Sequence, residues 1–259
     1  LAANELPDIF YTWLPGYATD FINSNAVMKL DNHLSTNAKT HLNMNAINSG
    51  NGAFDGIYAL PVEVKMGILY CNREMFEQYG IQMPDSYEQL LTAIDQFNQQ
   101  GIQPILAPGK RTWPIMWLYD ILAVKSIGTD ATISSLKKES SFNQPEFKMA
   151  AAKLQALVAR NAFGQDALLL DNNEANERFF QGLSPMYYMG SWIAATATDK
   201  KSAIAGKVTA KRFPGLGNEF DKHMLGGTGD GFMIANASEH KTEALQVLER
   251  YIQLMGESD

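Results

Sequence analysis

Several side chains that could bind a ligand stand at the ends of predicted strands. Trp13 follows an extended run at residues 9–12, and the local pattern requires no packing partner for an aromatic residue there. Glu63 lies on the polar side of an extended segment, and Asp230 stands in a glycine-rich run before a strand. Indole rings contact flat C–H surfaces, and carboxylates accept hydrogen bonds from hydroxyl groups. These residue types are suited to holding a polyhydroxylated molecule.

Each of these residues also has a structural interpretation. Trp13 could cover the rim of its domain. Glu63 could pair with Lys65 on an exposed strand, and Asp230 could stabilise a turn. The glycines of the run 226–231, including Gly227, let the backbone approach a ligand or flex. A phosphate-binding loop is the alternative for this run, but the Lys-Ser/Thr ending of that motif is missing.

The elements that must position these residues alternate between strand and helix. From Val62 to Met66, apolar and charged residues alternate, which predicts a half-buried strand. The apolar run 68–71 predicts a strand covered on both faces. Asn72 can cap the helix that follows, and Gly80 can end it. The alternation predicts an α/β architecture with mostly parallel sheets.

Two further segments carry clear local signals. Ser86 and Gln89 have the spacing of a capping box, in which each side chain bonds the backbone of the other residue. The run 186–189 predicts a buried strand, so the rings of Tyr187 and Tyr188 are expected to point to opposite faces. Such a pair belongs to the core in most cases.

Composition limits the class of protein. The 259 residues suffice for one large or two ordinary domains. A net charge of −7 argues against a basic surface for nucleic acid or anionic membrane. Cys71 is the single cysteine, which excludes an intrachain disulfide, and its apolar neighbours favour an inert core thiol. The four histidines are scattered without the pattern of a catalytic triad or a zinc site.

The order of several segments resembles the family 1 extracellular solute-binding proteins, the maltose-binding-protein-like subunits that capture sugars for bacterial ABC importers. The matching segments are Pro7-Asp8-Ile9, 60–80, Thr112-Trp113-Pro114, 180–192, Phe213-Pro214 and Gly226-Gly227. The resemblance implies a two-lobed periplasmic-binding-protein-like fold of type II. Lobe one is expected at 1–107 and 227–259, and lobe two at 108–226. Relatives of this kind are longer, so the chain is expected to lack N- and C-terminal parts.

The resemblance also implies a site. Trp13 and Trp192 are expected to stack on opposite sides of a sugar in an interlobe cleft. Arg111 and Trp113 are expected on the cleft wall, where the family often has an aromatic residue in place of Lys110 or Arg111. That departure hints at a more polar or acidic glycan. For Trp113, buried packing is the alternative. Glu63, Gly227 and Asp230 complete the expected ligand residues, and Tyr17 and Asp20, placed in a loop, are weaker candidates.

The implied function is capture without catalysis. The protein would bind a carbohydrate, deliver it to ABC permease subunits, and work in the periplasm or outside the cell. It would be anchored to the membrane only through a lipidated N-terminus upstream, and it would use no cofactor or metal. Three alternatives stay open. They are a ferric or other small-ligand binder of the same fold, a glycan-active enzyme, and a truncated fragment without independent activity.

Overall fold

The computed structural model describes residues 6–52 and 54–257. By their internal contacts, the residues divide into two compact units. Unit 1 comprises 1–65 and 226–259, and unit 2 comprises 66–225. The second boundary agrees with the predicted one within a residue, but the first lies after Lys65 rather than after residue 107. The reason is that Phe76 and Leu90 share one apolar core with Leu118 and Phe147.

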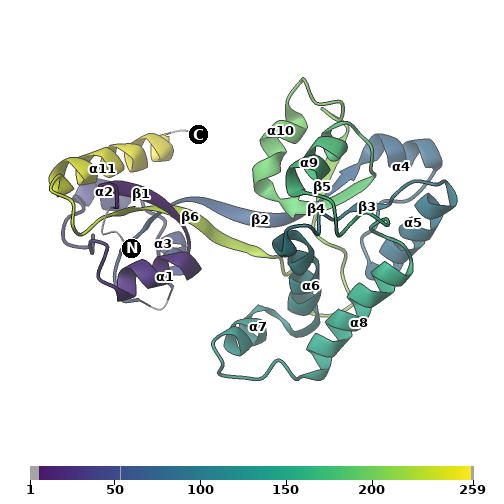
Figure 1. Ribbon diagram of the computed structural model, residues 1–259, viewed down its shortest axis with the longest axis horizontal. Coiled ribbons are helices and arrows are strands. Elements are labelled where there is room, and N and C mark those ends of the chain that lie inside the picture. Colours follow the sequence, from purple (N-terminus) through teal and green to yellow (C-terminus); the bar gives the residue numbers. More distant parts are fainter. Residues whose placement is uncertain (1–5, 53, 258–259) are drawn as a thin grey trace. The chain divides into compact units, whose positions relative to one another are not determined.

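Unit 1 is built on strands β1 (Ile9–Trp13), β6 (Gly226–Ile234) and the first part of β2 (Leu60–Asn72). The order is β1-β6-β2, and β1 runs antiparallel to β6, with Ile9 opposite Ile234 and Trp13 opposite Asp230. The helices of this unit are α1 (Gly16–Asn23), α2 (Thr36–Thr40), α3 (Met44–Asn51) and α11 (Lys241–Glu257) (Figure 1).

Unit 2 contains the rest of β2, which lies between β4 (Met186–Gly190) and β5 (Val208–Lys211) and is antiparallel to both. Strand β3 (Ile105–Leu106) runs parallel to β4. The remaining elements are α4 (Arg73–Tyr79), α5 (Tyr87–Gln99), α6 (Thr112–Ile127), α7 (Thr129–Leu136), α8 (Pro145–Ala159), α9 (Asn172–Phe180), a 3₁₀ turn (Ser191–Ile193) and α10 (Ala194–Thr198).

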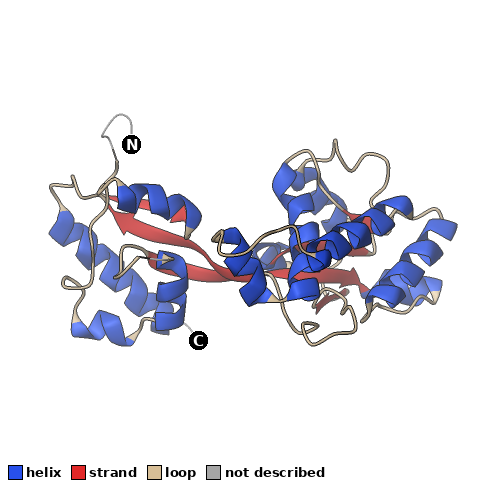
Figure 2. Cartoon of the chain, turned by 90° about the horizontal axis from the view of Figure 1, so that it is seen from below, coloured by secondary structure: helices blue, strands red, loops and turns tan. Residues whose placement is uncertain are grey.

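Helices flank the strands within each unit (Figures 1 and 2). In unit 2, α4, α5, α6 and α8 pack on the face that carries Tyr188, whereas α9 and α10 pack on the face that carries Tyr187. Both tyrosines are buried, and the Tyr187 hydroxyl donates to Asn176 Oδ1 at 3.0 Å. The expectation that their rings point to opposite faces is therefore confirmed.

Local sequence signals explain several helix ends. Ser86 and Gln89 form the predicted capping box, because the Ser86 hydroxyl accepts the Gln89 N–H and the Gln89 side chain accepts the Ser86 N–H. Gly80 ends α4 in the left-handed conformation with φ 64°, as predicted. Asn72 occupies the N-cap position of α4, but its side chain makes no capping hydrogen bond, so that detail is wrong.

Two strand predictions also need correction. The expectation of mostly parallel sheets is wrong, because among the pairings described only β3 with β4 is parallel. Alternation of strands and helices along a chain does not reveal which strands become neighbours. The predicted alternation in β2 is wrong as well, since Val64 and Met66 are exposed and Lys65 is half-buried. Lys65 lies over Gly229 of β6, where a side chain would overlap its methylenes.

Candidate functional site

Three indole rings gather on the surface of unit 2. Trp113 and Trp117 of α6 lie with their ring centroids 5.8 Å apart. Trp192 lies 5.9 Å from Trp113 and 5.4 Å from Trp117. The three rings are mutually tilted by 55–77°, which is a favourable edge-to-face arrangement. We call Trp113, Trp117 and Trp192 the indole patch.

The backbone brings these rings together in two ways. Residues four apart share one face of a helix, so Trp113 and Trp117 are neighbours on α6. Trp192 follows β4 directly, and its six-membered ring lies over Gly190, where any Cβ would overlap it. Ser191 holds this turn, because its hydroxyl accepts the Met66 N–H at 3.2 Å.

Trp192 is 36% exposed, whereas Trp113 and Trp117 are half-buried. Trp113 was expected either to pack in the core or to lie at the ligand site. It packs beside the core under α9, and it also contacts the partly exposed ring of Trp192. Sequence reasoning missed Trp117. Its spacing of four residues from Trp113 on a predicted helix was the available signal.

Arg111 precedes the indole patch at the N-cap position of α6. Its Nε lies 3.4 Å from Asp171 Oδ2, and both side chains keep solvent access. A hydrogen bond from the backbone N–H of Asn173, and next the Arg111 guanidinium, lower the pKa of Asp171. Backbone bonds tie this loop to the one before α9, with Gly109 N donating to Ala167 O at 2.7 Å. A ligand role for Arg111 stays a prediction.

Unit 1 carries a second set of polar and aromatic residues. Lys65 of β2 contacts Glu63 Oε1 at 3.2 Å and forms an ion pair with Asp230 of β6. The Asp230 side chain has no exposed surface. Tyr11 of β1 interacts with the same carboxylate. We call Tyr11, Glu63, Lys65 and Asp230 the ion-pair cluster.

The ion-pair cluster keeps its charges paired. Burial by itself would raise the pKa of Asp230, but hydrogen bonds from Lys65 and Tyr11 outweigh it and lower that pKa. Burial would likewise lower the pKa of Lys65, and its bonds to Asp230 and Glu63 raise it instead. Burial, and then the bond to Asp230, raise the pKa of Tyr11. Asp230 is thus an ionised carboxylate at neutral pH, held by a cation.

The predicted ligand residues of unit 1 fall into distinct environments. Glu63 forms the ion pair with Lys65 that was its structural alternative, and its ligand role stays a prediction. Asp230 does not lie in an entry loop or turn, because β6 already begins at Gly226. Gly227, the second residue of that strand, has φ 145°, a conformation that only glycine adopts readily.

Trp13 ends β1 and is 58% exposed. Its ring lies 5.2 Å from that of Tyr17, which is also largely exposed. The prediction that Tyr17 and Asp20 lie in a loop is wrong, since both belong to α1. Trp13 and Tyr17 therefore form an exposed aromatic pair, which an apolar face of a ligand could contact.

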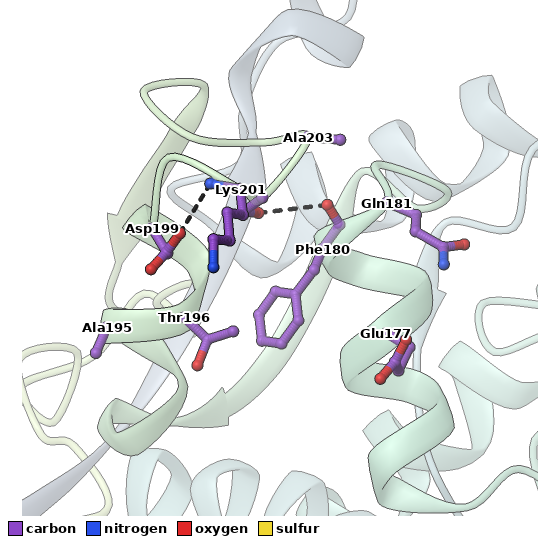
Figure 3. A pocket seen from close by; sticks show the side chains of 9 residues that line it. Glu177, Phe180, Gln181, Ala195, Thr196, Asp199, Lys201 and Ala203 are labelled. Carbon is purple, nitrogen blue, oxygen red and sulfur yellow. Dashed lines mark hydrogen bonds between the residues drawn. The ribbon is translucent and has the colours of Figure 1, made fainter.

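An open pocket of about 580 Å³ lies elsewhere in unit 2, between the end of α9, α10 and the loop that follows (Figure 3). Phe180 lies against it, and Glu177, Asp199 and Lys201 give it mixed charge. Its loop is shaped by local bonds, with Lys201 N donating to Asp199 Oδ1 at 2.8 Å. None of the predicted ligand residues lines it.

Metal-ligating clusters and membrane-spanning helices are two other features that could define a function. Among residues 6–52 and 54–257, no three His, Cys, Asp or Glu side chains are gathered closely enough to hold a metal ion. Across that same part of the chain, no helix is long and apolar enough to cross a lipid bilayer.

Comparison with known proteins gives consistent matches. The family model described as bacterial extracellular solute-binding protein matches residues 1–250. A "probable sugar-binding periplasmic protein" of Rhizobium meliloti strain 1021 is 25% identical over 204 residues, which cover 74% of this chain and 45% of the relative. The chain thus spans about half the length of the curated relatives it matches.

Solved structures resemble the chain over nearly its whole length. One, from work on xylan utilization by the thermophilic bacterium Caldanaerobius polysaccharolyticus, is 33% identical with a TM-score of 0.92, covering 98% of this chain and 65% of that one. A chitin oligosaccharide binding protein is 19% identical with a TM-score of 0.83, covering 98% and 63%, and indicates the fold alone. The expected two-lobed α/β fold is confirmed.

Proposed function

The chain belongs to the bacterial extracellular solute-binding proteins, and from that premise we propose that it binds a carbohydrate and delivers it to a bacterial ABC import permease. The proposed place of action is the periplasm or the cell exterior. The similarity to proteins named as sugar-binding and periplasmic supports both statements. Membrane anchoring would require a lipidated N-terminus and is not needed for capture.

The observation that carries the proposal is the indole patch. A pyranose ring presents C–H groups on its flat faces, and an indole face attracts them through dispersion and its negative quadrupole. Trp192 exposes part of its ring while Trp113 and Trp117 hold it in place, so little side-chain entropy is lost on binding. The exposed pair of Trp13 and Tyr17 is a second surface of the same chemistry.

Polar residues near these aromatics would complete recognition. Arg111 precedes Trp113 and keeps an exposed guanidinium beside Asp171, so it can donate to sugar hydroxyls or to a carboxylate. Glu63 keeps solvent access beside Lys65 and can accept hydroxyl protons. Asp230 would act indirectly, by holding Lys65 and Tyr11 in place, since its own side chain is buried.

Binding without catalysis fits the state of Asp230, the buried carboxylate among the predicted ligand residues. A glycoside hydrolase needs one protonated carboxyl group as acid and a second carboxylate as base or nucleophile. Asp230 has a lowered pKa and is engaged by Lys65, so it is poorly suited to donate a proton or to attack a sugar. Adjacent Tyr187 and Tyr188 would be the candidate ligands for the ferric alternative. They do not support it, because the two rings lie in different cores.

Calorimetric titration with xylotriose, chitotriose, raffinose and maltotriose tests the proposal. We expect saturable binding of at least one oligosaccharide with a stoichiometry near one. The same mixtures, incubated and then analysed by chromatography, should contain intact sugar only. Release of shorter sugars would support the enzyme alternative. A monodisperse, folded monomer that binds none of a wide panel of neutral, amino and acidic sugars would refute carbohydrate binding.

A further inference from the structure

A pair of facing glycines adjoins the indole patch in unit 2, and we call the spot around these two glycines the notch. Gly67 of β2 and Gly190 of β4 are directly opposite each other in the sheet, so this spot carries no side chain of its own. The Trp192 ring occupies the space above Gly190, and the Tyr188 hydroxyl occupies the space above Gly67. Because Cβ positions of a cross-strand pair lie about 5 Å apart, the phenol oxygen and the indole ring lie within about 10 Å of each other.

The Tyr188 hydroxyl is an unusual group. It is buried, and within the described residues it has no hydrogen-bond partner. Buried hydroxyl groups in folded proteins are nearly always satisfied, so an exception calls for a partner that the chain itself does not supply. The ring of Tyr188 packs against Phe213 at 5.2 Å, which fixes the hydroxyl at the notch.

Asp120 supplies the second polar group. It lies three residues after Trp117 and seven after Trp113, so it continues the same face of α6. It interacts electrostatically with Tyr188. Asp120 is half-buried, and no ion pair or hydrogen bond engages it in the part of the chain that the structure describes. Burial raises its pKa to about 6.

We propose that Asp120 is a specificity-determining ligand residue, which accepts a hydrogen bond from a sugar hydroxyl at the edge of the indole patch, and that Tyr188 donates to an oxygen of the same ligand. This rests on the proposed function. The notch selects neutral or amino sugars, because a uronic acid would bring a second negative charge against a partly desolvated carboxylate. This proposal differs from the expectation of an acidic glycan that was based on Lys110 and Arg111, because the notch would disfavour binding of an acidic sugar.

Protonation gives the notch a measurable signature. Asp120 interacts electrostatically with Tyr188, which belongs to β4, and with Tyr119, its neighbour on α6. Neither tyrosine ionises near neutral pH, because burial raises both pKa values. An ionised Asp120 accepts hydrogen bonds, and the protonated group accepts less well. Sugar affinity is therefore full above the pKa of Asp120 and declines as pH falls below about 6.

The test compares Asp120→Asn, Tyr188→Phe and the control Asp130→Asn, which removes an exposed carboxylate from α7 of the same unit. The probes are the tightest-binding neutral oligosaccharide of the panel and digalacturonate, titrated at pH 7.5 and 5. We expect Asp120→Asn to lower the affinity for the neutral oligosaccharide about tenfold at pH 7.5. The affinity of this variant should no longer fall between pH 7.5 and pH 5. The ratio of its affinities for the neutral oligosaccharide and for digalacturonate should be smaller than in the wild type. Asp130→Asn should change none of these.

Tyr188→Phe keeps the proposal testable if Asp120→Asn does not fold. Its hydroxyl has no partner in the ligand-free protein, so the melting temperature without sugar should stay or rise while the sugar-induced shift shrinks. Wild-type affinities for the neutral sugar that survive both substitutions and the change of pH would overturn the inference and leave carbohydrate binding intact. Failure of wild type to bind any sugar would overturn both.

Discussion

Replacing Trp192 by alanine should weaken sugar binding by about 30-fold. The side chain is 36% exposed, which for a tryptophan of about 250 Å² leaves about 90 Å² available to a ligand. Burying that area at about 25 cal/mol per Å² contributes about 2 kcal/mol. Because every 1.4 kcal/mol corresponds to a factor of about ten, the loss corresponds to a dissociation constant raised about 30-fold.

The substitution also removes packing against Trp113 and Trp117, so it needs a matched control. Tyr79→Ala serves, because Tyr79 lies in the same unit, is 37% exposed and packs on one aromatic ring, Phe97. Each variant should lose about 1–3 kcal/mol of unfolding free energy. Calorimetry well below both melting temperatures then compares fully folded proteins. Unchanged affinity in Trp192→Ala, or an equal loss in Tyr79→Ala, would contradict the stacking role.

Two further substitutions examine the supporting structure. Lys65→Met should leave Asp230 as a buried carboxylate without its cation and lower the free energy of unfolding, measured with urea, by about 3 kcal/mol. Adding Asp230→Asn should restore part of this stability. A double variant no more stable than Lys65→Met would count against a stabilising ion pair. In the wild type the pKa of Asp230 is lowered, so its contribution is complete at neutral pH and declines as pH falls below about 4. Gly190→Ala should displace the Trp192 ring, change tryptophan fluorescence and cost about 1–3 kcal/mol; an unaltered emission spectrum would show that the ring does not lie over this glycine.

Local signals in the sequence predicted local structure well. The capping box at Ser86 and Gln89 and the left-handed Gly80 depend on hydrogen bonds and backbone sterics within a few residues, so their spacing alone reveals them. The burial of Tyr187 and Tyr188 on opposite faces follows from the two-residue period of a strand. The family resemblance, rather than local pattern, predicted the two-lobed fold and the sugar-stacking role of Trp192.

Other predictions failed where distant segments decide the outcome. The first boundary between the units was expected after residue 107 but lies after Lys65. Phe76 and Leu90 pack with Leu118 and Phe147 in one core, and such long-range packing cannot be predicted from local sequence patterns. Val64 and Met66 were expected on the buried face of a half-buried strand, but they are exposed and Lys65 points inward instead. Its cationic end meets Asp230 from a strand more than a hundred residues later in the chain.

By itself, the sequence determined several strands and helices, the helix ends at Ser86 and Gly80, the exclusion of an intrachain disulfide and the supply of indole and carboxylate groups. Only the tertiary structure decided which of these groups meet. The contact of Trp192 with α6, the pairing of Gly67 with Gly190 under Tyr188, and the burial of Asp230 beside Lys65 each join residues far apart in the chain. Local periodicity specifies which way a side chain points, whereas its neighbours, and hence its exposure and charge, arise from long-range strand pairing and packing.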